Sequence, residues 1–378
     1  MTLTLTDELE AYRRAVRAQA ESTIGPFVKA LDCEQRFSRE VWDALRATDI
    51  FALPFPETAG GLGGSFLAFV VATEQIAAVG ATAALYPGTT VQVASTLLHY
   101  GTPSQIECWV PLLLRGDAPA AWAFTEPQTG SDPKQLLTTA VRDGDGWVLT
   151  GQKLFISLAR QAAIALVFAR TSDDRVGAFL VDPSSPGWST GQPFELMAFG
   201  GVEAAPVYLD DVRVPSDAVV GDSAHGFEVL LAGEGQGKIR VAAICVGIAQ
   251  RALEEARRYA LERKHRGEPI GRKFATIQGL LGDMQASTLS ARALVRSAAV
   301  MFDEGADVHE VAAAARLVAG RTAREVTSAA LQVCGAYGLT RELPLERLYR
   351  EGKFYEVAQG VAEIQRAVVA RRVMDATR

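Results

Sequence analysis

The chain has 378 residues, which is enough for more than one hydrophobic core. Hydrophobic residues make up 48% and charged residues 22%, a balance that excludes intrinsic disorder. The net charge of -6 excludes a basic surface for nucleic acid. Apolar stretches are interrupted too early for a membrane helix, and the first residues do not resemble a secretory signal. We therefore expect a cytoplasmic protein that binds neither nucleic acid nor membrane.

Residues 1–118 have helical periodicity and are expected to form an N-terminal helical domain. Ser38 is a suitable N-cap for a helix that carries Val41, Trp42 and Leu45, and further helices are expected at 66–79 and 90–100. The four cysteines have no metal-binding spacing, so buried free thiols and no metal site are expected. They are Cys33, Cys108, Cys245 and Cys334.

Residues 119–222 show alternating apolar residues, β-branched and aromatic side chains, and frequent turns, which predict a middle β domain. The sequence Asp143-Gly144-Asp145-Gly146 is a hairpin turn signal. The strands are expected at 121–125, 138–142, 147–154, 163–169, 177–181, 194–196 and 207–214.

Residues 223–378 return to helical periodicity, with long helices expected at 237–262, 274–303, 309–337 and 349–375. Four long antiparallel helices with short connections predict a four-helix bundle. The fold class is therefore multidomain α+β: an N-terminal helical domain, a middle β-barrel or sandwich, and a C-terminal helical bundle.

Two short motifs in the middle domain carry the functional signal. The first is Thr125-Glu126-Pro127-Gln128-Thr129-Gly130-Ser131-Asp132, a strand end followed by a tight polar corner. The second is Leu149-Thr150-Gly151-Gln152-Lys153-Leu154-Phe155-Ile156-Ser157. Together they resemble the acyl-CoA dehydrogenase family, with its T-E-P-x-A-G-S-D and L-x-G-x-K-x-[WF]-I-[TS] patterns. Thr129 stands where alanine is usual, and further matches extend the resemblance over essentially the whole chain.

The resemblance implies an FAD-dependent oxidoreductase with the same three-domain order. In the family, residues at these positions lie against the flavin ring or donate to its polar edge, and Ser131 also lies near the substrate's pantetheine arm. The corresponding residues here are Trp122, Phe124, Thr125, Gly130, Ser131, Phe155 and Ser157.

Two C-terminal segments resemble the family's dinucleotide-binding elements. Tyr259 to Ile270 matches Y-x-x-x-R-x-x-F-G-x-x-[IL], and residues 274–278 match the F-x-x-[IV]-Q that follows it. Arg266 stands where phenylalanine is usual. Residues 332–338 match Q-x-x-G-[GA]-x-G. In the family these segments contact the FAD of a neighbouring subunit, which implies a homotetramer or at least a dimer. The implied FAD contacts are Arg263, Phe274, Gln278, Gln332, Gly335, Val361 and Glu363.

The expected catalytic base is missing from the sequence. The family motif Y-E-G-[TS]-x-x-I-Q-R aligns with residues 358–366, so Gln359 stands where the glutamate is usual. A neutral amide cannot act as a general base. Some members take the base from the residue before an arginine that corresponds here to Arg240, but that residue is Ile239. By resemblance, Arg240 and Gly360 contact the thioester end of the substrate.

Three interpretations follow from this substitution. The chain dehydrogenates an acyl thioester with a relocated base, for which Glu234 and Glu356 are weak candidates, or with a base from the partner in a hetero-oligomer. Alternatively, it is a flavin-dependent monooxygenase, or a catalytically silent FAD-binding subunit. We favour the first, with an acyl-CoA or an acyl-carrier protein as substrate and electron-transfer flavoprotein or a similar protein as acceptor. Chain length and branching of the acyl group cannot be read from the sequence.

Overall fold

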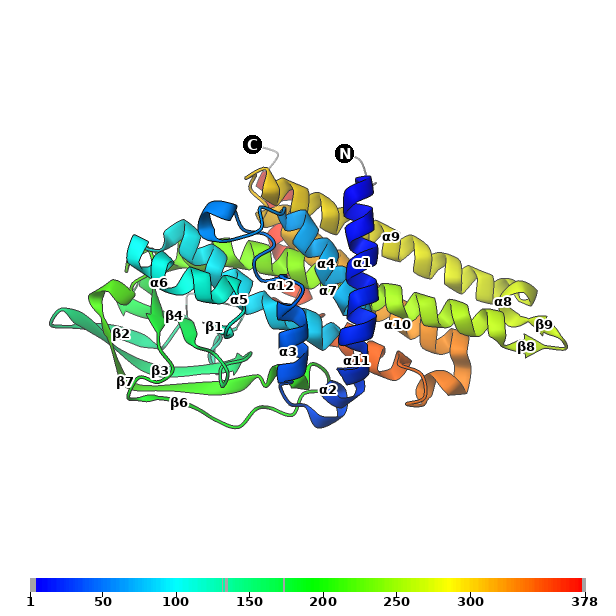
Figure 1. Cartoon of the computed structure of the whole chain (residues 1–378), viewed down its shortest axis with the longest axis horizontal. Coiled ribbons are helices and arrows are strands. Elements are labelled where there is room, and N and C mark those ends of the chain that lie inside the picture. Colours follow the sequence, from blue (N-terminus) through cyan, green and yellow to red (C-terminus); the bar gives the residue numbers. More distant parts are fainter. Residues whose placement is uncertain (1–4, 131, 133–134, 173, 376–378) are drawn as a thin grey trace.

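Helices form the two ends of the chain and a curled sheet forms its middle (Figure 1). This computed structural model describes residues 5–130, 132, 135–172 and 174–375. The predicted order of helical, β and helical parts is confirmed. None of the described helices combines the length and the hydropathy needed to cross a lipid bilayer.

The N-terminal part places two apolar helices inside a layer of amphipathic ones. Helices α4 and α5 are buried on nearly every face, because α1 and α3 cover them on one side and α7 on the other. Ser38 caps α3 as predicted, since its Oγ accepts from the backbone N–H of Val41 at 3.2 Å. The helices are α1 (Asp7–Thr23), α2 (Val28–Glu34), α3 (Arg39–Arg46), α4 (Phe66–Val79), α5 (Ala81–Tyr100) and α6 (Pro103–Leu114).

The middle part is a single curled sheet with the strand order β1-β4-β2-β3-β7-β6, in which β5 also pairs with β4. The predicted hairpin turn joins β2 to β3, with Gly144 at φ +60°. The prediction of a strand at 194–196 is wrong, because only Phe194 joins its neighbour, through one bond to Ala204. The strands are β1 (Ala120–Ala123), β2 (Thr139–Asp143), β3 (Gly146–Ile156), β4 (Ile164–Ser172), β5 (Arg175–Val181), β6 (Trp188–Thr190) and β7 (Ala205–Pro215).

The C-terminal part is organised around α7, which runs from the sheet to the opposite end of the molecule (Figure 1). The predicted start of this helix at residue 237 is too late, because glycines at 233, 235 and 237 lie inside it. Close packing overrides their low helix propensity. The elements are α7 (Gly226–Glu262), β8 (Lys264–His265), β9 (Glu268–Pro269), α8 (Ile270–Lys273), α9 (Ala275–Asp303), α10 (His309–Cys334), η6 (Gly335–Leu339), α11 (Leu345–Phe354) and α12 (Ala362–Asp375).

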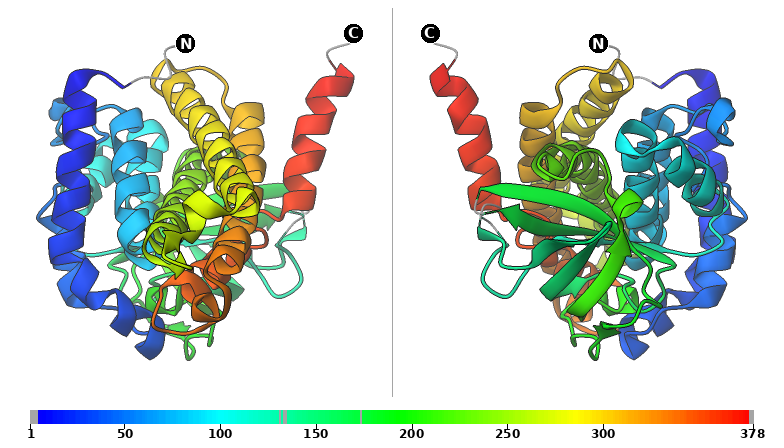
Figure 2. Two further views of the ribbon diagram at one scale, coloured as in Figure 1. Left: turned by 90° about the vertical axis from the view of Figure 1, so that its right-hand side faces the viewer. Right: turned by 90° about the vertical axis from the view of Figure 1, so that its left-hand side faces the viewer.

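The last predicted helix, 349–375, is interrupted. Helix α11 ends at Phe354 and α12 begins at Ala362, because Gln359 and Gly360 take left-handed φ values of 53° and 84°. Figure 2 shows α12 on the outside of the bundle, on the side away from α1. Gln359 therefore lies in a loop rather than on a helix.

The cysteines are all free thiols, and the prediction that they are buried holds for two of them. Cys245 and Cys334 are buried, whereas Cys33 and Cys108 are exposed. Among the described residues, no group of three or more His, Cys, Asp or Glu side chains could hold a metal ion.

Candidate active site

The end of β1 presents a wall of aromatic side chains towards the helical part. The ring of Trp122 lies 4.9 Å from that of Phe168, and the ring of Phe124 lies 6.1 Å from Phe168 on the next strand of the sheet. The buried Trp122 Nε1 has no hydrogen-bond partner among the described residues. A buried donor without a partner indicates a place where a polar ligand edge is expected.

A buried ion pair fixes the loop that follows this wall. Lys153 Nζ lies 2.7 Å from Glu126 Oε1 and donates to the carbonyls of Phe124 and Phe168. Glu126 also accepts from the backbone N–H groups of Leu137 and Thr138. Burial lowers the pKa of Lys153 to about 8, although the adjacent carboxylate opposes this shift. Glu126 and the backbone at Leu137 and Thr138 are therefore held together from inside the sheet.

Several predicted flavin contacts surround this corner. Thr125 and Ser157 are half-buried, and their hydroxyls form no hydrogen bond with the described residues. Phe155 has a left-handed φ of 57°, is 53% exposed, and packs on Phe194 with ring centroids 4.6 Å apart. Gly130 is exposed, and a Cβ added at this glycine would lie 3.8 Å from the methyl carbon of Thr125. Ser131 lies outside the described residues.

Helix α7 packs against this wall through its glycine face, which consists of Gly233 and Gly237. A Cβ at Gly233 would lie 2.4 Å from the Trp122 ring, so the helix backbone and the indole are in direct contact. One turn further, a Cβ at Gly237 would lie 2.5 Å from Gln359 Nε2 and 3.3 Å from Gln92 Oε1. The glycines thus bring β1, α5 and the Gln359 loop to adjacent turns of one helix.

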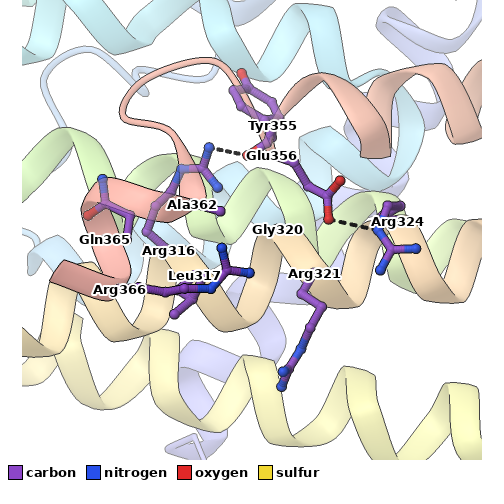
Figure 3. Close-up of a pocket in the computed structure, with 10 residues that line it drawn as sticks. All are labelled: Arg316, Leu317, Gly320, Arg321, Arg324, Tyr355, Glu356, Ala362, Gln365 and Arg366. Carbon is purple, nitrogen blue, oxygen red and sulfur yellow. Dashed lines mark hydrogen bonds and ion pairs between the residues drawn. The ribbon is translucent and has the colours of Figure 1, made fainter. Parts of the chain in front are cut away.

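A buried arginine of α10 holds the backbone of the Gln359 loop. The Nη2 atom of Arg316 donates to the carbonyl of Ala358 at 2.7 Å and to the carbonyl of Tyr355 (Figure 3). Arg316 also lines a small cleft of about 70 Å³ with Gln365, whose side-chain amide is buried without partners. These contacts set the position of Gln359 without using its side chain. Gly360 and Val361 lie in the same loop and are half-buried.

Arg240 lies in the middle of α7 and not at its start, and its surroundings are unusual. It is 3% exposed, and its guanidinium fills the space that a side chain at Gly88 of α5 would need. Its Nη1 has no hydrogen-bond partner in the part of the chain that the structure describes. Ile239 is fully buried in the core, so the residue of α7 that faces Gln359 is Gly237. Neither residue carries a carboxylate.

The carboxylates of Glu234, Glu356 and Glu363 differ in their surroundings. Glu356 is paired with Arg324 and Lys353, each at 2.7 Å, and Glu363 is 75% exposed and paired with Arg366. Because residues 355–361 are not helical, neither shares a helix face with Gln359. Glu234 lies between Gly233 and Gly237, and burial raises its pKa even though Lys238 and Arg240 oppose this.

The remaining predicted FAD contacts gather at the opposite end of α7. Arg263, Phe274, Gln278, Gln332 and Gly335 are all exposed, on the β8–β9 hairpin side of the molecule (Figure 1). About thirty helical residues separate Gly233 from Arg263, which is roughly 45 Å at the usual rise. A single dinucleotide cannot reach both groups within one chain. The two groups can serve the same site only if one of them comes from a second chain.

The residues at both ends fit the parts of FAD. The sheet end offers aromatic faces, unpartnered hydroxyls of Thr125 and Ser157, and the unpartnered indole N–H of Trp122, which suit a flat ring with a polar edge. The far end offers an exposed guanidinium and a glycine at φ +59° with open space beside it, which suit a pyrophosphate.

Sequence reasoning did not identify Gln92, Gly88, Gly237 or Arg316 as parts of the site. The signal for Gly237 was present, since alternating glycines in a helical segment are costly and need a packing reason. Gln92, Gly88 and Arg316 carry no local signal, because only the tertiary fold brings α5 and α10 next to the Gln359 loop.

Family models match almost the whole chain. The N-terminal, middle and C-terminal domain models of acyl-CoA dehydrogenases match residues 6–117, 121–212 and 224–374. The probable acyl-CoA dehydrogenase YngJ of Bacillus subtilis is 34% identical over 99% of this chain and 100% of its own length.

Other similar proteins agree with this match. The acryloyl-CoA reductase (NADH) of Anaerotignum propionicum is 33% identical over 99% of this chain and 96% of its own length. The structure of butyryl-CoA dehydrogenase from Megasphaera elsdenii matches with a TM-score of 0.96 and 30% identity, covering 99% of this chain and 100% of that one.

Proposed function

Because this chain belongs to the acyl-CoA dehydrogenase family, we propose that it is an FAD-dependent oxidoreductase that dehydrogenates an acyl thioester between its α- and β-carbons. The observation that carries this proposal is the glycine face of α7. It places the aromatic wall at Trp122 and the loop at Gln359 on adjacent helical turns, so that a thioester between them meets both.

The reaction removes a proton from the α-carbon and a hydride from the β-carbon, and a carbon–carbon double bond forms between them. FAD, when bound, supplies the hydride acceptor. The chain must supply a base for the proton and donors for the thioester carbonyl, whose oxygen gains charge as the proton leaves. Gln359 Nε2 lies against the bare backbone at Gly237, so the side chain at position 359 faces the glycine turn of α7.

We assign the base to Glu234. It lies on the glycine turn of α7, between the residue that contacts Trp122 and the one that contacts Gln359. Burial raises its pKa, which makes the carboxylate a better proton acceptor than an exposed one. Glu356 is disfavoured because two ion pairs hold it. The loss of the carboxylate at position 359 is thus compensated from α7 rather than by a partner of different sequence.

The assembly that completes the cofactor site is a homo-oligomer. Arg263, Gln332 and Gly335 at the far end of one chain bind the pyrophosphate of FAD held by the sheet end of another, because the two ends of one chain are too far apart. Electron-transfer flavoprotein or a similar protein then accepts the electrons. The oligomer itself needs no second kind of subunit.

The test is anaerobic titration of the purified, FAD-loaded protein with a panel of acyl-CoAs, followed by visible absorption. We expect Glu234→Gln to slow flavin reduction by at least about 100-fold, because general-base contributions are of that size. Glu356→Gln is the matched control and should change the rate less than about 3-fold. Gln359→Glu should raise the rate, since it restores a carboxylate over the α-carbon.

Each other outcome points to a different interpretation. If Glu234→Gln reduces flavin as fast as the wild type, the base lies elsewhere. If only Gln359→Glu reduces flavin, the chain alone lacks a base, and a partner must supply it or the subunit is silent. Oxygen consumption driven by NAD(P)H or reduced flavin, with no reduction by acyl-CoA, would support the monooxygenase instead.

A further inference from the structure

We propose that the small cleft between α10 and α12 binds hydrogen phosphate, which links these two helices across the loop that carries Gln359. The cleft has a volume of about 70 Å³ and lies beside that loop (Figure 3). Its lining residues differ from those that the proposed function assigns to FAD and to the thioester. The inference therefore goes beyond the proposed function and holds whichever residue is the catalytic base.

The first support is an excess of positive charge around the cleft. Among the described residues that line it, one carboxylate, that of Glu356, stands against four guanidinium groups. This carboxylate is already paired, because Arg324 and Lys353 each lie 2.7 Å from it. Arg321 forms no ion pair with any described residue. In a chain with a net charge of -6, such a local excess favours an anion. The four guanidinium groups belong to Arg316, Arg321, Arg324 and Arg366.

The second support is a set of buried polar atoms without partners. The Nε of Arg316 and both the Nε2 and the Oε1 of Gln365 form no hydrogen bond within the part of the chain that the structure describes. Arg316 is 2% exposed and Gln365 is 1% exposed, and both line the cleft. Buried polar groups are nearly always paired in folded proteins. Three unpaired atoms around one cavity therefore indicate a polar ligand.

The chemistry of these three atoms selects the ligand. Arg316 Nε and Gln365 Nε2 are donors, whereas Gln365 Oε1 is an acceptor. Hydrogen phosphate offers oxygen atoms to both donors and a hydroxyl to the acceptor. Sulfate and chloride carry no hydroxyl near neutral pH, so either ion would leave the buried Oε1 unpaired, which is unfavourable. Guanidinium also matches the geometry of phosphate oxygens.

The size and the position of the cleft suit one such ion. A buried water occupies roughly 10–15 Å³ of such space, so the cleft has room for several waters or one tetrahedral oxyanion, but not for a nucleotide. Helix α12 begins at Ala362, which also lines the cleft. The positive end of its helix dipole therefore adds to the attraction for an anion.

A bound ion would connect the two sides of the Gln359 loop. On one side, Arg316 of α10 already holds two carbonyls of the loop. On the other side, Gln365 Nε2 of α12 fills the space that a side chain at Gly360 would need. An ion that binds both Arg316 and Gln365 therefore braces the loop between the two helices.

Calorimetry measures the binding. Potassium phosphate is titrated into the FAD-loaded oligomer near neutral pH, and potassium sulfate and potassium chloride are titrated at the same ionic strength. We expect saturable binding of phosphate with a dissociation constant of about 1 mM or lower. Sulfate should bind at least about 10-fold more weakly, because it leaves the Gln365 Oε1 without a donor.

Two variants and a control make the result specific. Gln365→Leu removes the amide atoms and Arg366→Gln removes a guanidinium of α12, and each should weaken phosphate binding at least about 10-fold. Without phosphate, Gln365→Leu should unfold no more easily than the wild type, since an unpaired buried amide contributes no stability. Arg39→Gln, which breaks an exposed ion pair on α3, is the matched control and should change the affinity less than about 2-fold. Arg316 is unsuitable for this test, because its loss also releases the loop carbonyls.

Hydrogen exchange locates the bound ion. With phosphate, the backbone amides of residues 355–361 should exchange at least about 5-fold more slowly in the wild type, and their exchange should not change in Gln365→Leu. If phosphate binds the FAD-free protein but not the FAD-loaded oligomer, the ion occupies the pyrophosphate site and the inference is wrong. Absence of saturable binding, or equal affinities of the wild type and Gln365→Leu, would also overturn it. The acyl-CoA titration tests the proposed function separately, because none of these measurements depends on flavin reduction.

Discussion

The two ends of α7 both carry candidate cofactor contacts, but the chain holds them in different ways. At the sheet end, Trp122 is packed between Phe168 and the backbone of Gly233, and nearby Glu126 forms a fully buried ion pair with Lys153. At the far end, Arg263 and Gln332 are exposed, and Tyr337 and Leu339 beside them are 53% and 73% exposed. One end is buried by folding, whereas the other presents exposed side chains, as the proposed contact with a second chain requires.

Under the proposed function, this difference lets one site be rigid at the flavin ring and shared between chains at the pyrophosphate. The flavin-ring contacts must be held closely, because hydride transfer depends on geometry. The pyrophosphate contacts contribute mainly charge, which tolerates less exact placement and can come from another chain. Buried interactions are therefore concentrated at the sheet end, where a variant should destabilise the fold. At the far end a variant should weaken cofactor binding alone.

The largest effect is expected from Lys153→Met. It leaves the Glu126 carboxylate buried without its cation, which should lower the free energy of unfolding by about 3–5 kcal/mol. Urea unfolding measures this loss. The matched control is Arg213→Met, which removes an exposed pair with Asp143 and should cost less than about 0.5 kcal/mol.

A second variant distinguishes charge from packing at the sheet end. Lys153→Met combined with Glu126→Gln removes both charges and should recover part of the lost stability, since no uncompensated charge is left. If the double variant is as unstable as the single one, the role of the pair is hydrogen bonding to the loop rather than charge balance.

The segment between the two ends gives a pH-dependent prediction. Glu351 of α11 is 2% exposed, and burial raises its pKa from 4.5 to about 7 although Arg347 opposes the shift. Below pH 4.5 the carboxyl is protonated in both the folded and the unfolded chain. As the pH rises from 4.5 to 7, the unfolded chain loses the proton first, so folding loses about 3 kcal/mol from this group.

Glu351→Gln should remove this dependence. Between pH 5 and pH 8, the free energy of unfolding of the wild type should fall by about 3 kcal/mol relative to that of the variant. Urea unfolding of both proteins at each pH measures this difference. A constant difference across this range would mean that Glu351 is ionised in the folded protein.

The comparison also separates what the sequence could predict from what it could not. The aromatic wall and the interruption of regular structure at Pro127 follow from local residue patterns, and so does the basic turn at Arg263. Ser38 as a helix cap was predicted and is confirmed. These features depend on neighbours in the chain, which a sequence displays directly.

Features that depend on contacts between distant segments could not be predicted. The helix expected from 349 to 375 is interrupted because Arg316 of α10 holds the carbonyls of Tyr355 and Ala358. The contact of the Arg240 guanidinium with Gly88 of α5 is recognisable only in the folded chain. Likewise, Glu234 becomes a candidate base only because α7 begins at Gly226, so that Glu234 lies on the same helix as Gly233 and Gly237.

The smallest effect on the fold, and the sharpest test of the far end, is expected from Arg263→Glu. Because Arg263 is exposed, the variant should unfold within about 0.5 kcal/mol of the wild type in the absence of FAD. Its affinity for FAD should fall about 30- to 100-fold, since a charge-assisted contact to phosphate is replaced by repulsion. Retained flavin absorbance after dialysis measures the affinity.

Complementation shows whether the arginine acts on its own chain or on a neighbour. Thr125→Trp should exclude the flavin ring from the sheet end, and Arg263→Glu should weaken the pyrophosphate contact, so each variant alone should lose FAD. When the two variants are refolded together, some sites are formed by one chain of each kind. Such a shared site is intact when Thr125 comes from the Arg263→Glu chain and Arg263 comes from the Thr125→Trp chain. About a quarter of all sites should then regain FAD. If the mixture binds no more FAD than the separate variants, Arg263 serves its own chain, and the far end of α7 is not part of a neighbour's site.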